Sequence, residues 1–126
     1  MRFMMFMIPN IPPGDDWMPT AEAVAEMSTY NDELSKAGVL LALDGLHPAP
    51  EGVRVAFPGG KATVTDGPFT EAKEVIGGYW LIEVKSKEEA VEWAKRAPCA
   101  DGPVIEVRQV FEMEEFPPEV RAAAGR

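Results

Sequence analysis

The side chains best suited to acid-base chemistry in this sequence lie in two loops. His47, in the stretch DGLHPAP, is the only histidine, and its unperturbed pKa is near neutrality. Asp66 opens the stretch TDGPFTEAKEVIGGYW, where a carboxylate before Gly-Pro can act as a base or can accept backbone N–H bonds that fix a turn. Asp66 and His47 are therefore the candidate catalytic residues. The alternatives are a turn-forming role for Asp66 and an exposed position without chemistry for His47.

Six further residues are candidates for contacting a small molecule. Charged side chains after the turn can line a pocket rim or form ordinary surface ion pairs. The aromatic ring after Gly-Pro is expected to anchor its loop in the core, and a tryptophan after the first strand can cap a pocket or seal the core edge. A glycine that begins a strand permits close approach of a ligand or of a neighbouring strand, and is also typical of a bulge. These candidates are Trp17, Phe69, Glu71, Lys73, Glu74 and Gly78.

Composition argues against several kinds of partner. The chain has 21 Asp and Glu against 12 Lys and Arg, and its net charge of −9 disfavours direct binding to nucleic acid and to anionic membranes. One histidine and the single Cys99 are too few for a transition-metal site, so we expect no metal and no other cofactor. The apolar start MRFMMFMIP ends without a cleavage site, which predicts a buried strand in a cytoplasmic protein rather than a signal peptide.

Hydrophobic periodicity predicts the elements that position these residues. A helix is expected from the N-cap Thr20 to Gly38, because apolar side chains recur every three or four residues between them. A second helix follows Ser86, whose hydroxyl is expected to accept from the Glu89 amide while the Glu89 carboxylate reaches back to the Ser86 amide. Strands are expected over 3–8, 39–46, 77–84 and 103–111, with a hairpin over 53–57 and 61–65.

This order of elements predicts an α+β fold. Two split βαβ units with an inserted β-hairpin give a ferredoxin-like domain, in which a four-stranded antiparallel sheet carries both helices on one face. The predicted strands are apolar on both faces, and nothing in the chain is available to cover the second face. We therefore expect a homodimer that pairs through its sheet faces.

Several motifs together resemble one family. TDGPF, with EAKE and GGYWLIEV after it, AGVLLALDGLHP before it and PVIEVRQVFEMEEF at the end, resembles the DGPF group of YCII-related (YciI-like) proteins. The resemblance runs from the first strand to Phe116. It implies a domain over 1–116 followed by a C-terminal tail over 117–126, and a dimeric α/β barrel of ferredoxin-like protomers. It also implies a group of largely unassigned activity, often encoded near extracytoplasmic-function sigma factors.

Resemblance to the wider YCII-related family implies an enzyme, but this chain departs from the family's catalytic pattern. Many members carry a histidine on the first helix, paired with an aspartate at a pocket. Here the equivalent position is Met27, whose thioether cannot carry a proton. We therefore do not assign the family's catalytic histidine-aspartate pair to this chain.

Two functional interpretations therefore remain. The first is a dimer that binds a small organic molecule in a pocket of the barrel, linked to sigma-factor or stress-response operons. The alternative is an enzyme of the YCII-related type that uses Asp66 or His47 for acid-base chemistry on a small organic substrate. Convergence of Asp66, His47 and Glu74 on one cavity would favour the enzyme.

Overall fold

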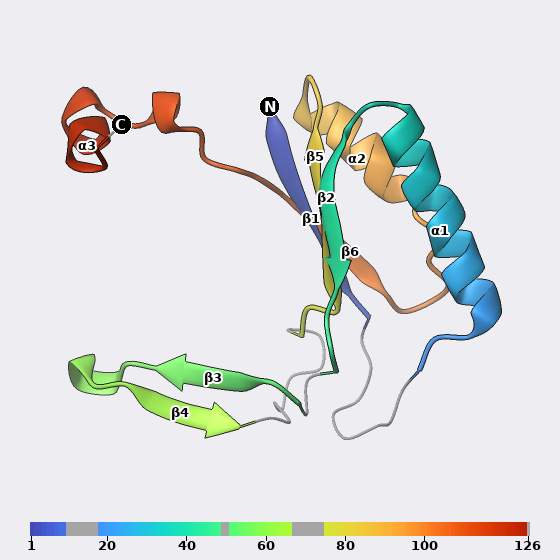
Figure 1. Ribbon diagram of the computed structural model, residues 1–126, viewed down its shortest axis with the longest axis horizontal. Helices are drawn as coiled ribbons and strands as arrows, with labels where there is room; N and C mark the ends of the chain where they lie inside the picture. Colours follow the sequence, from blue (N-terminus) through green and yellow to red (C-terminus); the bar gives the residue numbers. More distant parts are fainter. Residues whose placement is uncertain (10–17, 49–50, 67–74, 126) are drawn as a thin grey trace.

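The protein folds into two layers, a four-stranded antiparallel sheet and a pair of helices on one of its faces (Figure 1). The structure, a computed structural model, describes residues 1–9, 18–48, 51–66 and 75–125. The observed architecture is the predicted α+β, ferredoxin-like fold, with a hairpin inserted between its two halves.

The sheet places the first strand of the chain at its centre. Its four strands are β1 (Arg2–Ile8), β2 (Leu40–Gly45), β5 (Gly78–Glu83) and β6 (Val104–Gln109). Their order in the sheet is β2-β5-β1-β6, and every neighbouring pair is antiparallel. β1 therefore forms hydrogen bonds with a strand on each side, as its continuous run of apolar residues predicted.

Both helices begin at the predicted caps. α1 (Ala21–Lys36) starts after Thr20, whose hydroxyl accepts from the backbone N–H of Ala23 at 3.1 Å. Gly38 follows α1 with φ +76°, the left-handed conformation that ends many helices. α2 (Lys87–Lys95) starts after Ser86.

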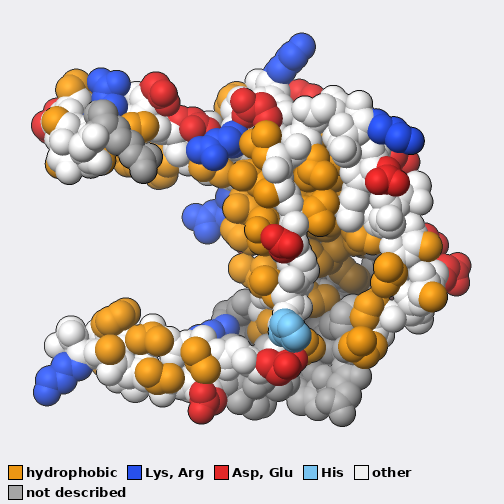
Figure 2. Space-filling view, viewed as in Figure 1, with side chains coloured by type: hydrophobic (Ala, Val, Ile, Leu, Met, Phe, Trp, Pro, Cys, Tyr) orange, Lys and Arg blue, Asp and Glu red, His pale blue; other side chains and the backbone are white. Residues whose placement is uncertain are grey.

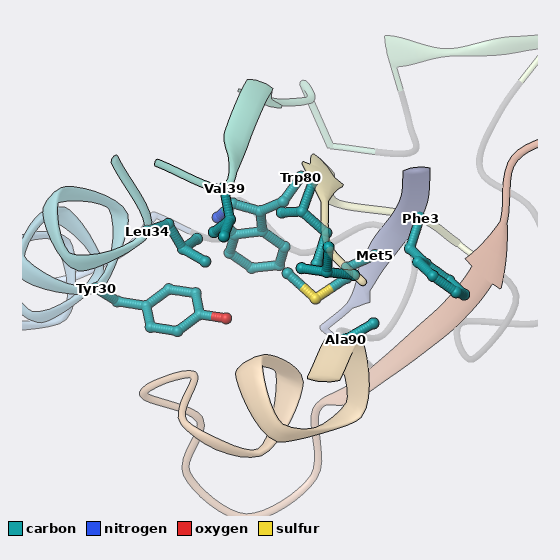
Figure 3. Close-up of a cluster of buried hydrophobic side chains, with 9 residues drawn as sticks. Phe3, Met5, Tyr30, Leu34, Val39, Trp80 and Ala90 are labelled. Atoms are coloured by element: carbon teal, nitrogen blue, oxygen red, sulfur yellow. The ribbon is translucent and has the colours of Figure 1, made fainter. Parts of the chain in front are cut away.

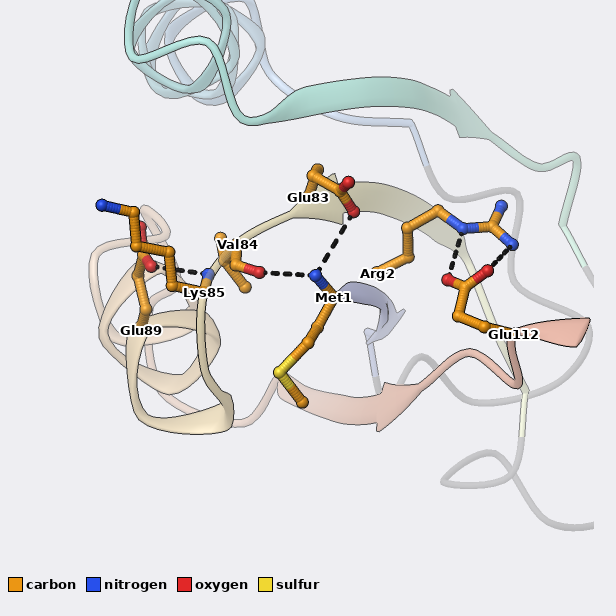
Figure 4. Close-up of polar contacts among 7 residues, drawn as sticks. All are labelled: Met1, Arg2, Glu83, Val84, Lys85, Glu89 and Glu112. Carbon is orange, nitrogen blue, oxygen red and sulfur yellow. Dashed lines mark hydrogen bonds and ion pairs between the residues drawn. The ribbon is translucent and has the colours of Figure 1, made fainter. Parts of the chain in front are cut away.

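One half of the predicted capping box at α2 was wrong. The Ser86 hydroxyl accepts from the Glu89 amide at 3.1 Å, as expected. The Glu89 carboxylate, however, accepts from the amide of Lys85 at 2.9 Å rather than from that of Ser86 (Figure 4). The carboxylate reaches one residue further back, so it still satisfies a backbone donor that precedes the helix.

The core lies between the helices and the sheet (Figure 3). Trp80 is held from two sides, because its ring meets Tyr30 edge-on at 5.7 Å between centroids and its indole N–H donates to Asn31 Oδ1 at 2.8 Å. The Tyr30 hydroxyl donates to the backbone carbonyl of Trp93 at 2.7 Å, which ties α1 to α2. The buried core residues are Phe3, Met5, Tyr30, Leu34, Val39, Trp80, Ile82, Val84 and Ala90.

Two segments project from the sheet on the side away from the helices (Figure 1). The first is the predicted hairpin, β3 (Val53–Ala56) and β4 (Thr63–Asp66), joined through the 3-10 turn η2 (Pro58–Gly60). All residues of β3 and β4 are exposed. The second segment follows β6 and contains the 3-10 turn η4 (Met113–Glu115) and the short helix α3 (Pro118–Ala123).

α3 lies where the sequence suggested only a tail. Pro118 occupies the first turn of the helix, where its missing N–H costs nothing, and the alanines that follow favour helix. Within the described residues, no helix is both long enough and apolar enough to cross a lipid bilayer.

Candidate functional site

The sheet face opposite the helices is apolar at its centre, and no helix or strand of the described residues packs over it (Figure 1). Alternation along β1 sends Phe3 and Met5 into the core and Met4, Phe6 and Ile8 to the other side. The register sets Met4 beside Leu81 and Phe6 beside Tyr79. We call these five residues, which are all partly exposed, the open face: Met4, Phe6, Ile8, Tyr79 and Leu81.

The open face forms the wall of a hollow. Figure 2 shows hydrophobic side chains gathered on this wall, between the two projecting segments. Charged residues border its apolar centre on the β6 side. Glu106 and Arg108 lie opposite Phe6 and Met4, with 4.0 Å between Glu106 Oε2 and Arg108 Nε. A ligand or partner that entered the hollow would meet an apolar floor with a polar rim.

One end of the open face carries a hydroxyl paired with a carboxylate. Asp44 lies opposite Tyr79 in the pairing of β2 with β5, and the Tyr79 hydroxyl donates to Asp44 Oδ2 at 3.1 Å. This hydrogen bond to the carboxylate raises the pKa of Tyr79. Both side chains are accessible, so the pair offers one donor-acceptor group beside the apolar floor.

The other end of the open face is held by ionic contacts (Figure 4). Arg2 donates from its guanidinium to both carboxylate oxygens of Glu112, at 2.8 and 3.0 Å. This bidentate pairing raises the pKa of Arg2 and lowers that of Glu112. The N-terminal amine of Met1 donates to the Val84 carbonyl at 2.9 Å and lies 3.6 Å from Glu83 Oε2. A shallow groove of about 450 Å³ runs along this end, lined by Met1, Arg2, Glu83, Gln109, Glu112, Glu114 and Glu115.

The two predicted catalytic residues lie on different segments, His47 before the hairpin and Asp66 at its end. His47 follows β2, is 87% exposed, and has its Nδ1 3.4 Å from Glu51 Oε2. Asp66 is the exposed last residue of β4. Among the described residues, no hydrogen bond or ion pair joins His47 to Asp66. Their catalytic roles therefore stay predictions.

Close packing between two strands explains why residue 78 is a glycine. A Cβ atom at Gly78 would lie 2.9 Å from the carbonyl oxygen of Asp44, on the adjacent strand, and one at Gly77 would lie 3.0 Å from the Pro9 ring. The absence of side chains lets β5 approach β2 closely at the site of the Tyr79–Asp44 pair. Contact of Gly78 with a ligand stays a prediction.

The other five predicted ligand contacts lie outside the described residues: Trp17, Phe69, Glu71, Lys73 and Glu74. The convergence of Glu74 with Asp66 and His47 therefore stays a prediction too. In the part of the chain that the structure describes, no three His, Cys, Asp or Glu side chains gather where a metal ion could bind.

Sequence reasoning missed Asp44 and Tyr79. Each residue alone is an unremarkable polar position on a strand with apolar neighbours. The signal appears only when the two strands are aligned, because the register that sets Leu81 beside Ala42 also sets Tyr79 beside Asp44. A predicted strand pairing with its register would have been needed to find this site.

Titration of Tyr79 tests the pairing with Asp44. In a Tyr30→Phe background, Tyr79 is the one remaining tyrosine, which removes the signal of Tyr30, whose pKa is raised to about 12 by burial. We expect an alkaline absorbance titration to give Tyr79 a pKa above that of free tyrosine, and Asp44→Asn to lower it because the amide carries no charge. An unchanged tyrosine pKa after Asp44→Asn would refute the hydrogen bond.

Comparison with known proteins assigns most of the chain to one family. The family model of the YCII-related domain matches residues 1–114. An uncharacterised protein of Rhizobium meliloti (strain 1021) is 31% identical over 70 residues, a match that covers 56% of this chain and 56% of that protein's length. The family match extends from the first strand through the whole sheet and into η4. The chain therefore belongs to the YCII-related family.

Proposed function

We propose that this YCII-related protein binds a small organic molecule at the end of the open face marked by Tyr79 and Asp44, as a dimer that pairs through its sheet faces. The observation that carries the proposal is the uncovered apolar floor that ends at a hydroxyl-carboxylate pair. Apolar floors with a few polar groups are typical of small-molecule sites.

The open face also supports the dimer. Soluble proteins rarely leave a continuous apolar sheet face in water, because an exposed face of this kind promotes association. The helix side of the sheet is closed by α1 and α2, whereas Met4, Phe6 and Leu81 have no cover within the described chain. A second copy stacked on the first covers most of the apolar floor and leaves room for a ligand at its end.

The chemistry of the site indicates the kind of ligand. Phe6 and Ile8 provide contacts for an apolar body, and the Asp44 carboxylate can accept a hydrogen bond from an amine or hydroxyl in addition to that from Tyr79. The net negative charge of the chain disfavours strongly anionic molecules. We therefore propose a neutral or cationic molecule with an apolar part and a donor group.

A thermal-shift screen against a metabolite library tests this proposal. For a compound that raises the melting temperature, Asp44→Asn is expected to weaken binding tenfold or more, roughly the effect of losing a charged hydrogen bond. Asp32→Asn, an equal change on the exposed side of α1, serves as the matched control and should bind like the parent. Equal affinity of the parent and Asp44→Asn would exclude this end of the open face as the binding site.

The same assay tests the predicted role of Asp66. Asp66→Asn keeps the size of the side chain and most of its acceptor capacity, so we expect a melting temperature within a few degrees of the parent and a weaker thermal shift with the identified compound. A protein that unfolds on this substitution would show that the carboxylate anchors the turn instead.

A further inference from the structure

Two projecting arms carry large apolar side chains that stay mostly exposed among the described residues. The hairpin arm, residues 53–66, exposes Phe57 by 67% and Val64 by 64%. The C-terminal arm, residues 111–125, exposes Phe111 by 70%. Phe111 stacks on Phe116 with 5.0 Å between ring centroids, so the C-terminal arm presents an aromatic surface to its surroundings.

The arms leave opposite ends of the sheet toward the same side. The C-terminal arm follows Gln109, which lies opposite Phe3 near the start of β1. The hairpin arm follows β2, whose last residue, Gly45, lies opposite Gly78, itself paired with Met7 near the end of β1. Figures 1 and 2 show both arms reaching past the open face, with the hollow between them.

The C-terminal arm is fixed in this projecting position at its base. The Arg2 guanidinium donates two hydrogen bonds to the Glu112 carboxylate (Figure 4). Within the arm, the Glu115 carboxylate accepts from the Glu112 amide at 2.7 Å. The Arg2–Glu112 pair connects the start of the arm to β1, and beyond it η4 and α3 extend away from the sheet. An arm that is held away from its own domain while it exposes aromatic rings is suited to contact another molecule.

The C-terminal arm carries a groove, and its charge is opposite to that of the hairpin tip. A groove of about 530 Å³ on the C-terminal arm is lined by Met113, Glu114, Pro118, Arg121 and Ala122. The tip of the hairpin arm carries the exposed ring of Phe57 and the ammonium group of Lys61. The C-terminal arm has four glutamates against one arginine over residues 111–125, so it attracts a basic tip and repels a second copy of itself.

Symmetry limits how two copies can stack through the open face. The two-fold axis of such a dimer lies between the sheets. An axis parallel to the strands brings like arms together, so two acidic C-terminal arms would meet. An axis across the strands brings the C-terminal arm of each copy to the hairpin arm of the other, where their charges are opposite.

We infer that the partner of these arms is a second copy of this chain, and that the Phe57–Lys61 tip of each hairpin arm binds in the groove between η4 and α3 of the other copy. This inference rests on the proposed sheet-face dimer and specifies its orientation. It also makes the candidate site composite, because the C-terminal arm of the partner arrives at the end of the open face that carries Tyr79, Asp44 and His47.

Cross-linking of single-cysteine variants tests the inference. Cys99→Ser removes the native thiol, and Lys61→Cys and Glu114→Cys are then made in separate chains at exposed positions. Because each chain carries one cysteine, a short bismaleimide can join only two different chains. We expect a covalent dimer when the two variants are mixed, with peptide mass spectrometry locating the link between positions 61 and 114.

Controls separate this inference from the proposed dimer. Val24→Cys, on the exposed side of α1, should cross-link to neither variant. If light scattering shows a dimer but each variant links mainly to itself, or if no link forms between 61 and 114, the arm exchange is wrong while the sheet-face dimer stands. A monomer by light scattering in the parent chain at micromolar concentration would overturn both.

Discussion

Replacement of Leu34 by alanine is expected to destabilise the fold by about 2–5 kcal/mol, the range observed when a large buried side chain is truncated. Leu34 has no exposed surface and lies on α1 within the core cluster, so its removal leaves a cavity between helix and sheet. Urea unfolding followed by circular dichroism, at one fixed protein concentration, measures the change.

Leu41→Ala is the matched control for this experiment. Leu41 is 52% exposed on the edge strand β2, where truncation should change the free energy of unfolding by about 0.5 kcal/mol or less. Equal losses for the two leucines would mean that α1 does not pack on the sheet as described, and the helix-covered face would have to be reassigned.

Replacement of Leu81 by glutamate is expected to convert the dimer to a monomer. Leu81 lies beside Met4 at the centre of the open face, and a carboxylate there would be buried without a partner when two sheets stack. A penalty of several kcal/mol raises the dissociation constant by about 100-fold or more. Because Leu81 is only partly buried in the single chain, the fold itself should survive, which circular dichroism can verify.

Val24→Glu is the matched control for the effect of Leu81→Glu on the dimer. Val24→Glu places the same charge on the exposed side of α1, where it should leave the mass measured by light scattering unchanged. If Leu81→Glu remains a dimer at the concentration at which the parent does, the interface lies elsewhere, and the open face must be covered by something other than a second sheet.

The sequence predicted the sheet and helices well because their signals are local. Thr20 and Gly38 mark the ends of α1 through backbone requirements that hold in any environment, an oxygen for an unpaired N–H and a positive φ. The apolar run of β1 predicted a strand with neighbours on both sides, and the sheet order confirmed it.

The features that the sequence did not predict depend on how separate elements are placed relative to each other. The alternation of Val53 and Val55 is typical of a strand with one buried face, yet both side chains are exposed because the hairpin stands apart from the sheet. Periodicity reports which residues share a face, and says nothing of what that face meets. The pairing of Asp44 with Tyr79 and the crowding at Gly78 likewise depend on how β2 aligns with β5.

The central position of β1 sets the order in which this protein can assemble. β1 precedes the other strands in the chain, but both of its neighbours, β5 and β6, come from the second half, and the Arg2–Glu112 contact spans 110 residues. Long-range pairings of this kind slow folding, because the chain loses the entropy of closing a long loop before the stabilising contacts form. Until β5 has been synthesised, the most apolar strand of the protein has no native neighbour, so the nascent chain should depend on chaperones for longer than a protein of this size with local pairings.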